Sequence, residues 1–81
     1  MYTKIQFGHD LKKNIITRQK ISIIGSWTYE IYLQNITKID PDLKKILINL
    51  GTMELGPEFE FSYEELDTIA DDLIAGKDVH I

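Results

Sequence analysis

The stretch IITRQKISIIGSWTYEIYLQ, residues 15–34, decides how the chain is expected to fold. It is rich in Ile, Thr and Tyr, and β-branched and aromatic residues are enriched in β-strands. Gly25-Ser26 interrupts the stretch as the loop of a β-hairpin would. The sequence therefore predicts two antiparallel strands, over residues 15–24 and 28–34, joined by a tight turn.

The length of that turn sets which side chains of the hairpin face the core. A two-residue loop puts Lys20 on the same face as Ile31, whereas a three-residue loop over residues 25–27 pairs Ile24 with Thr28. Because a one-residue slip exchanges the two faces, only a loop with an odd number of residues gives a clean apolar side. The inward residues are then Ile21, Ile23, Tyr29, Ile31 and Leu33. The outward residues are Arg18, Lys20, Ser22, Glu30, Tyr32 and Gln34.

The segment before the hairpin also favours a strand. Within residues 2–8, Ile5 and Phe7 alternate with Lys4 and Gln6, and a period of two is typical of a strand with one buried face. The polar residues 9–13 are expected to form the following turn. The sheet would then be a three-stranded antiparallel meander.

The segment after the hairpin, IDPDLKKILINLG, predicts a helix. Asp40 can cap it, Pro41 fits the first helical position, and Gly51 is a suitable end. The apolar residues recur at helical spacing. They are Leu43, Ile46, Leu47 and Leu50.

A second helix is expected within GPEFEFSYEELDTIADDL, residues 56–73. Residues 58–61 alternate, which predicts an extended segment with both Phe rings inward and both acids outward. Ser62 and Glu65 then match a capping box, and Phe61 and Leu66 have the spacing of a hydrophobic staple. The predicted buried stripe is Leu66, Ile69, Ala70 and Leu73, with Gly76 as the end of the helix.

Together these segments predict a single α+β domain over residues 1–81: a meander with two helices on one face. Residues 78–81 could add a short strand or simply fray. Hydrophobic content of 43% and charged content of 27% are ordinary for a globular protein. No cysteine is present, which excludes a disulfide scaffold and a cysteine zinc site. No signal-like segment or apolar run of about 18 residues is visible, so the expected location is the cytoplasm, with no membrane partner.

Charge is distributed unevenly along the chain. Residues 1–50 hold eight basic and four acidic residues, whereas residues 51–81 hold nine acidic residues and Lys77 alone. Asp67 and Asp71 are like charges four residues apart, which disfavours a helix slightly. Acids in the last turn also meet the negative end of the helix dipole. Charges that disfavour a helix, with no stabilising contact visible in the sequence, tend to mark a functional surface. The acidic face is therefore expected to meet a basic partner. The alternative is that the acids only make the protein soluble.

The residues expected to make that contact are Glu58, Glu60, Glu64, Asp67 and Asp71, with Phe59 and Trp27 as apolar anchors. Trp27, placed at the hairpin tip, could equally fold over the edge of the core. Adjacent carboxylates on a helix point apart, so no metal site and no cofactor are predicted.

The passage GTMELGPEFEFSYEELDTIADDLIAG, residues 51–76, resembles small bacterial immunity proteins that accompany contact-dependent growth-inhibition and related polymorphic toxins. The resemblance covers about the C-terminal third and rests on no signature motif, so no functional residue is carried over. It implies a cytoplasmic, non-catalytic inhibitor that occupies the active site or substrate surface of a cognate toxin, often a basic nuclease.

Two other classes of function are weighed against this one. Lys12, Lys13, Arg18 and Lys20 form a basic strip of the kind that nucleic-acid-binding modules use. The bulk acidity of the chain counts against nucleic acid as the main partner. His9-Asp10 and His80 supply the only imidazoles, and without a nucleophile or a spacing motif they do not indicate an enzyme.

Overall fold

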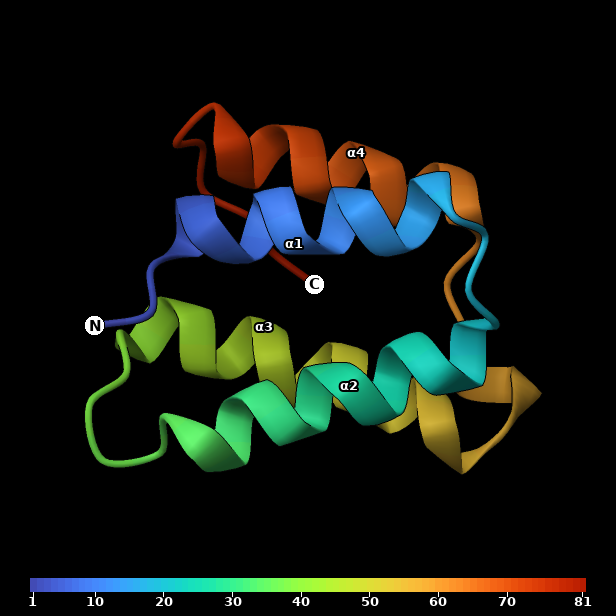
Figure 1. Ribbon diagram of the computed structural model, residues 1–81, viewed down its shortest axis with the longest axis horizontal. Coiled ribbons are helices and arrows are strands. Elements are labelled where there is room, and N and C mark those ends of the chain that lie inside the picture. Colours follow the sequence, from blue (N-terminus) through green and yellow to red (C-terminus); the bar gives the residue numbers. More distant parts are fainter.

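The structure, a computed structural model, describes all 81 residues and contains helices but no β-sheet (Figure 1). In chain order the elements are α1 (Lys4–Ile16), α2 (Ile21–Gln34), α3 (Pro41–Gly51), the short 3₁₀ helices η1 (Thr52–Leu55) and η2 (Pro57–Phe59), and α4 (Tyr63–Ile74). The expected α+β class, with its three-stranded meander, is therefore wrong. The only strand-like feature is an isolated parallel bridge between Tyr2 and Ile39.

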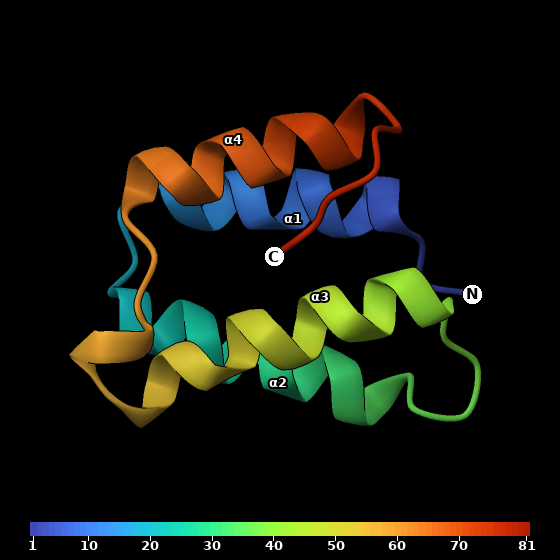
Figure 2. The same ribbon diagram turned by 180° about the vertical axis from the view of Figure 1, so that it is seen from behind.

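The helices form two layers, which Figures 1 and 2 show from opposite sides. One layer holds α1 packed along α4, and the other holds α2 packed along α3 and η1. Both layers contribute to one apolar core of 13 buried residues. They are Phe7, Leu11, Ile15, Ile24, Leu43, Ile46, Leu47, Leu50, Met53, Leu66, Ile69, Ala70 and Leu73.

Helix α1 replaces the first predicted strand and the turn after it. The Thr3 hydroxyl accepts a hydrogen bond from the Gln6 amide at 3.1 Å and so caps the helix. Phe7, Leu11 and Ile15 are buried at intervals of four, whereas Ile5 is 50% exposed. The alternation over four residues was thus too short a pattern, and the helical stripe that runs through the expected turn outweighs it.

Helix α2 replaces the predicted hairpin and runs without interruption through Gly25-Ser26. Gly25 is buried against η1, where a Cβ atom would lie 2.7 Å from the Glu54 backbone nitrogen. The glycine therefore permits close packing of two helices and does not mark a turn. The Ser26 hydroxyl donates to the Glu54 carboxylate at 2.6 Å and strengthens the same contact.

The change from strand to helix also exchanges which residues of this segment are inside. Ile23, Tyr29 and Leu33, which the hairpin register placed inward, are 49%, 43% and 49% exposed. Ile24 and Thr28, four residues apart, are fully buried, and the Thr28 hydroxyl donates to the Ile24 carbonyl at 2.8 Å. Although α2 is rich in apolar residues, no helix in the chain combines the length and apolar character needed to cross a membrane.

The two helices predicted in the C-terminal half are confirmed. In α3, the Asp40 carboxylate accepts from the Asp42 amide at 2.8 Å, Pro41 begins the helix, and the predicted apolar stripe is buried. Gly51 is the last residue of α3, but the chain continues directly into η1.

In α4, Ser62 and Glu65 form the predicted capping box, with bonds of 2.9 and 3.1 Å. The predicted stripe of α4 is buried. Gly76 follows the helix with φ 76°, and its amide and that of Lys77 return to the carbonyls of Leu73 and Asp72. This is the Schellman arrangement, which favours glycine at that position.

Two smaller expectations near α4 are wrong. Residues 57–59 form η2 instead of an extended segment, so Phe59 is 44% exposed and only Phe61 packs against the core. Residues 78–81 form no strand. Instead Val79 contacts the core, and the Asn49 side chain donates to the Ile81 carbonyl at 2.9 Å.

Candidate binding surface

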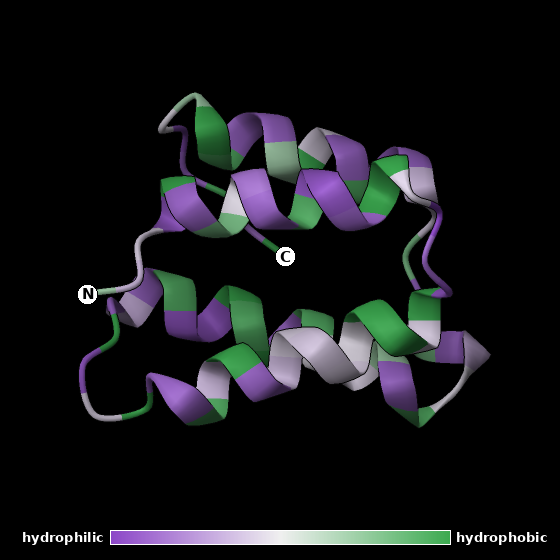
Figure 3. Cartoon of the chain, viewed as in Figure 1, coloured by the Kyte–Doolittle hydropathy of each residue, from purple (hydrophilic) through white to green (hydrophobic).

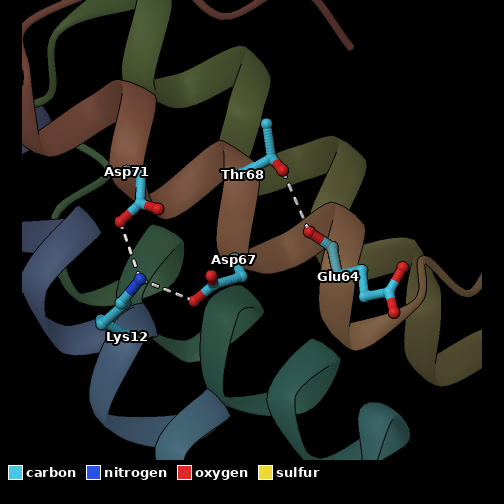
Figure 4. Close-up of polar contacts among 5 residues, drawn as sticks. All are labelled: Lys12, Glu64, Asp67, Thr68 and Asp71. Atoms are coloured by element: carbon cyan, nitrogen blue, oxygen red, sulfur yellow. Dashed lines mark hydrogen bonds and ion pairs between the residues drawn. The ribbon is translucent and has the colours of Figure 1, made fainter.

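The carboxylates of the C-terminal third divide into two groups, according to whether a cation meets them. On α4, Asp67 and Asp71 both face α1, and the Lys12 ammonium lies between them (Figure 4). Its Nζ atom is 2.7 Å from an oxygen of each carboxylate. We call this three-residue cluster the Lys12 clamp.

The Lys12 clamp offsets the repulsion between Asp67 and Asp71, which the sequence of α4 alone leaves unexplained. Hydrogen bonds to Asp67 and Asp71 raise the pKa of Lys12 above its ordinary value. One ammonium group thus relieves the repulsion between two like charges on α4 and ties α4 to α1. The unfavourable spacing of Asp67 and Asp71 is therefore accounted for by structure, and it no longer argues for a partner.

The other seven acids of residues 51–81 meet no cation. Glu58, Glu60 and Glu64 are exposed, and the three ion pairs of the molecule all involve other carboxylates. The half-exposed ring of Phe59 lies within the same segment. We call Glu58, Phe59, Glu60 and Glu64 the acidic corner, because they follow the chain from η2 into the first turn of α4.

Two acidic residues on either side of the acidic corner, Glu54 and Glu65, make hydrogen bonds that fix its position. Glu65 completes the capping box with the Ser62 amide, and Glu54 accepts the hydroxyl of Ser26 on α2. These bonds fix the two ends of the segment against α4 and α2. The three free carboxylates are consequently presented on an anchored turn, with the Glu64 side chain pointing away from the Lys12 clamp (Figure 4).

Trp27 lies elsewhere, inside the contact between the layers. Its ring stacks on that of Phe7, with centroids 5.4 Å apart and an angle of 14° between the planes, and it packs against the core. The core interpretation of Trp27 thus fits its position. Of the sequence candidates, Glu58, Phe59, Glu60 and Glu64 are exposed along the segment from η2 into the first turn of α4. Asp67, Asp71 and Trp27 lie in contacts between helices.

The four residues of the predicted basic strip, Lys12, Lys13, Arg18 and Lys20, also divide into two whose charged groups contact other side chains and two whose charged groups do not. Lys12 is engaged in the clamp, and the Arg18 guanidinium lies 4.8 Å from the centre of the Tyr63 ring. Arg18 also ends α1 with φ 55°, a left-handed conformation that costs a non-glycine residue about 1 kcal/mol. Only Lys13 and Lys20 are exposed without a partner of this kind.

Comparison with protein-family models, curated proteins and solved structures finds no match to this chain.

One feature that sequence reasoning missed is a cavity of about 620 Å³ beside α3. It is lined by Lys4, Asp42, Lys45, Ile46, Asn49, Asp78, Val79, His80 and Ile81. The lining holds two lysines and two aspartates, so its positive and negative side chains balance. The Nζ atom of Lys4 lies 3.8 Å from a carboxylate oxygen of Asp42, so these two charges form an ion pair with each other. No group of three or more His, Asp or Glu residues is placed to hold a metal ion. Because the last four residues form one wall, no local motif could have indicated the cavity.

Proposed function

We propose that this chain is a non-catalytic binding and inhibitory protein of the immunity type, which neutralises a basic, nuclease-like bacterial toxin domain through the acidic corner. Such an inhibitor would act in the cytoplasm of the cell that makes it. The observation that carries the proposal is the set of three exposed, cation-free carboxylates on the short segment that also holds the half-exposed Phe59 ring.

The mechanism follows from charge and exposure. Unpaired carboxylates on a surface create a negative potential that raises the encounter rate with a basic partner and selects against acidic ones. An aromatic ring among them can enter a pocket of the partner and supply affinity, as anchor residues of interfaces commonly do. The acidic corner offers both components on one short, anchored segment.

The proposed function assigns no catalytic role to the two histidines. His9 is exposed on α1, and His80 lies in the tail beside Lys45 and Asp78.

The nucleic-acid alternative has less support. Lys12 and Arg18 are engaged within the fold, which leaves Lys13 and Lys20 from the predicted strip. Two cations on a protein of net charge −4 give a weak field for phosphate binding. A band shift of RNA or DNA at low salt would favour this alternative over the proposed function.

The proposed function is tested by co-expressing the chain with a basic toxin-like domain encoded beside it and measuring growth. We expect the wild-type chain to restore growth and the charge-reversed variant Glu58→Lys/Glu60→Lys to fail. The matched control, Asp72→Lys/Asp78→Lys, reverses two acids outside the corner and should still protect. Equal protection by both variants, or none by the wild type, would contradict the proposal.

A further inference from the structure

The cavity beside α3 is built from three separate parts of the chain, and none of them belongs to the acidic corner. One wall is a face of α3. Its residues Asp42, Lys45, Ile46 and Asn49 follow the spacing of three and four that places side chains on one side of a helix. Lys4, in the first turn of α1, contributes a second wall. Residues from two helices that are distant in sequence thus face one space.

The tail, residues 78–81, forms the third wall, and the fold holds it near α3. Gly76, with φ 76°, turns the chain after α4, and the tail runs from the end of α4 toward α3 (Figure 2). Val79 packs against the core, and the Asn49 side chain donates to the Ile81 carbonyl at 2.9 Å. Hydrophilic and hydrophobic residues alternate along the tail (Figure 3). This anchored wall therefore adds both polar and apolar groups to the cavity.

The cavity also holds two opposite charges that pair with no other charge of the protein. Lys4 and Asp42 form an ion pair with each other. Lys45 and Asp78 line the same cavity but take part in none of the three ion pairs of the molecule. One free ammonium and one free carboxylate are therefore offered to whatever enters this space.

We propose that this cavity binds a small zwitterion with an apolar group, the chemistry shared by apolar amino acids and short apolar peptides. The carboxylate of the ligand meets the Lys45 ammonium, and the ammonium of the ligand meets the Asp78 carboxylate. Its apolar group lies against the three apolar residues of the lining, which are Ile46, Val79 and Ile81.

The size and the net charge of the lining favour this class of ligand. A volume of about 620 Å³ lies within the range of roughly 300–1,000 Å³ that is typical of small-molecule sites. With His80 counted as neutral, two lysines and two aspartates cancel. A ligand with an excess of one sign, such as a phosphate ester, meets repulsion from part of this lining. A zwitterion satisfies both free charges at once.

The first test titrates the full chain with leucine and, separately, with alanylleucine, and follows the backbone amide signals by NMR. Because exposed ion pairs contribute little, we expect saturable binding with a dissociation constant of roughly 1 mM for at least one of the two ligands. The signals that shift should be those of residues 45–49 and 78–81. Tighter binding of leucine assigns the cavity to free amino acids, and tighter binding of alanylleucine assigns it to peptides. No saturable binding up to about 20 mM, or shifts confined to other residues, overturns the proposal.

The second test asks whether both charged ends of the ligand are recognised. For the tighter ligand, acetylating its amine or converting its carboxylate to an amide should each weaken binding about three- to fivefold, as the loss of one exposed ion pair does. Equal affinities of the free and blocked forms overturn the proposal.

Variants then assign each end of the ligand to its partner. Lys45→Gln should bind the free and the amide forms equally, and Asp78→Asn should bind the free and the acetylated forms equally. Each comparison is made on one variant, so a change in its stability does not affect the result. The matched controls Lys44→Gln and Asp72→Asn neutralise charges outside the lining and should keep the wild-type preferences. Preferences that survive in Lys45→Gln and Asp78→Asn, or that disappear in the controls, overturn the assignment.

Discussion

Lys12 joins two helices through one ammonium group, so its removal should affect stability more than the removal of a neighbouring lysine. Lys12→Met leaves Asp67 and Asp71 facing each other without a cation, and we expect a lower free energy of unfolding. Lys13→Met, which alters an exposed lysine without an ion pair, is the matched control. Urea denaturation at low and high salt measures the effect.

Screening by salt weakens interactions between exposed charges, so the difference between the Lys12 and Lys13 variants should shrink at high ionic strength. The raised pKa of Lys12 has a related consequence. The stability that the clamp contributes is fully present below the ordinary lysine pKa and is lost as the pH rises through the folded value. A salt-independent difference would mean that Lys12 acts through packing of its aliphatic stem.

Tyr2 gives a second pH-dependent contribution at the residue scale. Burial raises its pKa, and its hydrogen bond to the Asp10 carboxylate, at 2.5 Å, raises it further. At pH values above about 10 the unfolded chain releases the phenol proton while the folded chain retains it, so stability falls as the pH rises.

Tyr2→Phe should cost about 1 kcal/mol at pH 7, because the hydrogen bond is lost. It should also flatten the decline of stability between about pH 10 and pH 12 relative to the wild type. The variant keeps the other three tyrosines, so any effect of their ionisation on stability is common to both proteins. Thermal unfolding across this pH range provides the measurement, and parallel curves for the two proteins would contradict the assignment.

At the scale of elements, α2 is the segment whose structure most changes the interpretation of the sequence. Ile24 is fully buried and Ile23 is 49% exposed, the reverse of the hairpin register. Ile24→Ala should therefore destabilise the protein by about 2–4 kcal/mol, and Ile23→Ala by less than about 1 kcal/mol. Chemical denaturation of the two variants distinguishes helix from hairpin. A larger loss for Ile23→Ala would indicate that the hairpin is correct.

The elements that could be predicted are those with a capping signal at the start and a regular apolar stripe after it. Asp40-Pro41 before α3, and Ser62 with Glu65 before α4, are local capping patterns, and each precedes a regular apolar stripe. Helices α1 and α2 carry weaker signals. Lys20 makes no side-chain capping bond to α2, and the β-branched residues of α2 favour strands until tertiary packing is considered.

Gly25 shows why local reasoning failed for α2. As an isolated feature of the sequence, Gly25-Ser26 is typical of a turn. Its actual environment is the backbone of η1, about thirty residues further along the chain, with Ser26 bonded to Glu54. A glycine that permits two helices to approach and a glycine that turns a hairpin have the same local signature, so only the packing partner separates them.

At the scale of the whole molecule, charge is arranged by contacts that sequence position does not reveal. The acidic run near the C-terminus and its exposed members Glu58, Glu60 and Glu64 could be predicted. The pairing of Lys12 with Asp71 could not, because 59 residues separate them. Sequence reasoning therefore found the acidic segment but could not separate the carboxylates that stabilise the fold from those left free.

We propose that the acidic corner meets a basic partner and that the Lys12 clamp does not. The proposal is tested by measuring the association rate with a basic, nuclease-like toxin domain that this chain protects against, at two ionic strengths. The variants are Glu58→Gln/Glu60→Gln and Asp67→Asn/Asp71→Asn, which each remove two negative charges, so a difference between them reports position and not net charge. We predict that the corner variant associates about tenfold more slowly than the wild type at low salt, and that this difference in association rate becomes smaller at high salt. The clamp variant should associate at nearly the wild-type rate. Equal rates for the wild type and the corner variant, or slowing confined to the clamp variant, would contradict the account.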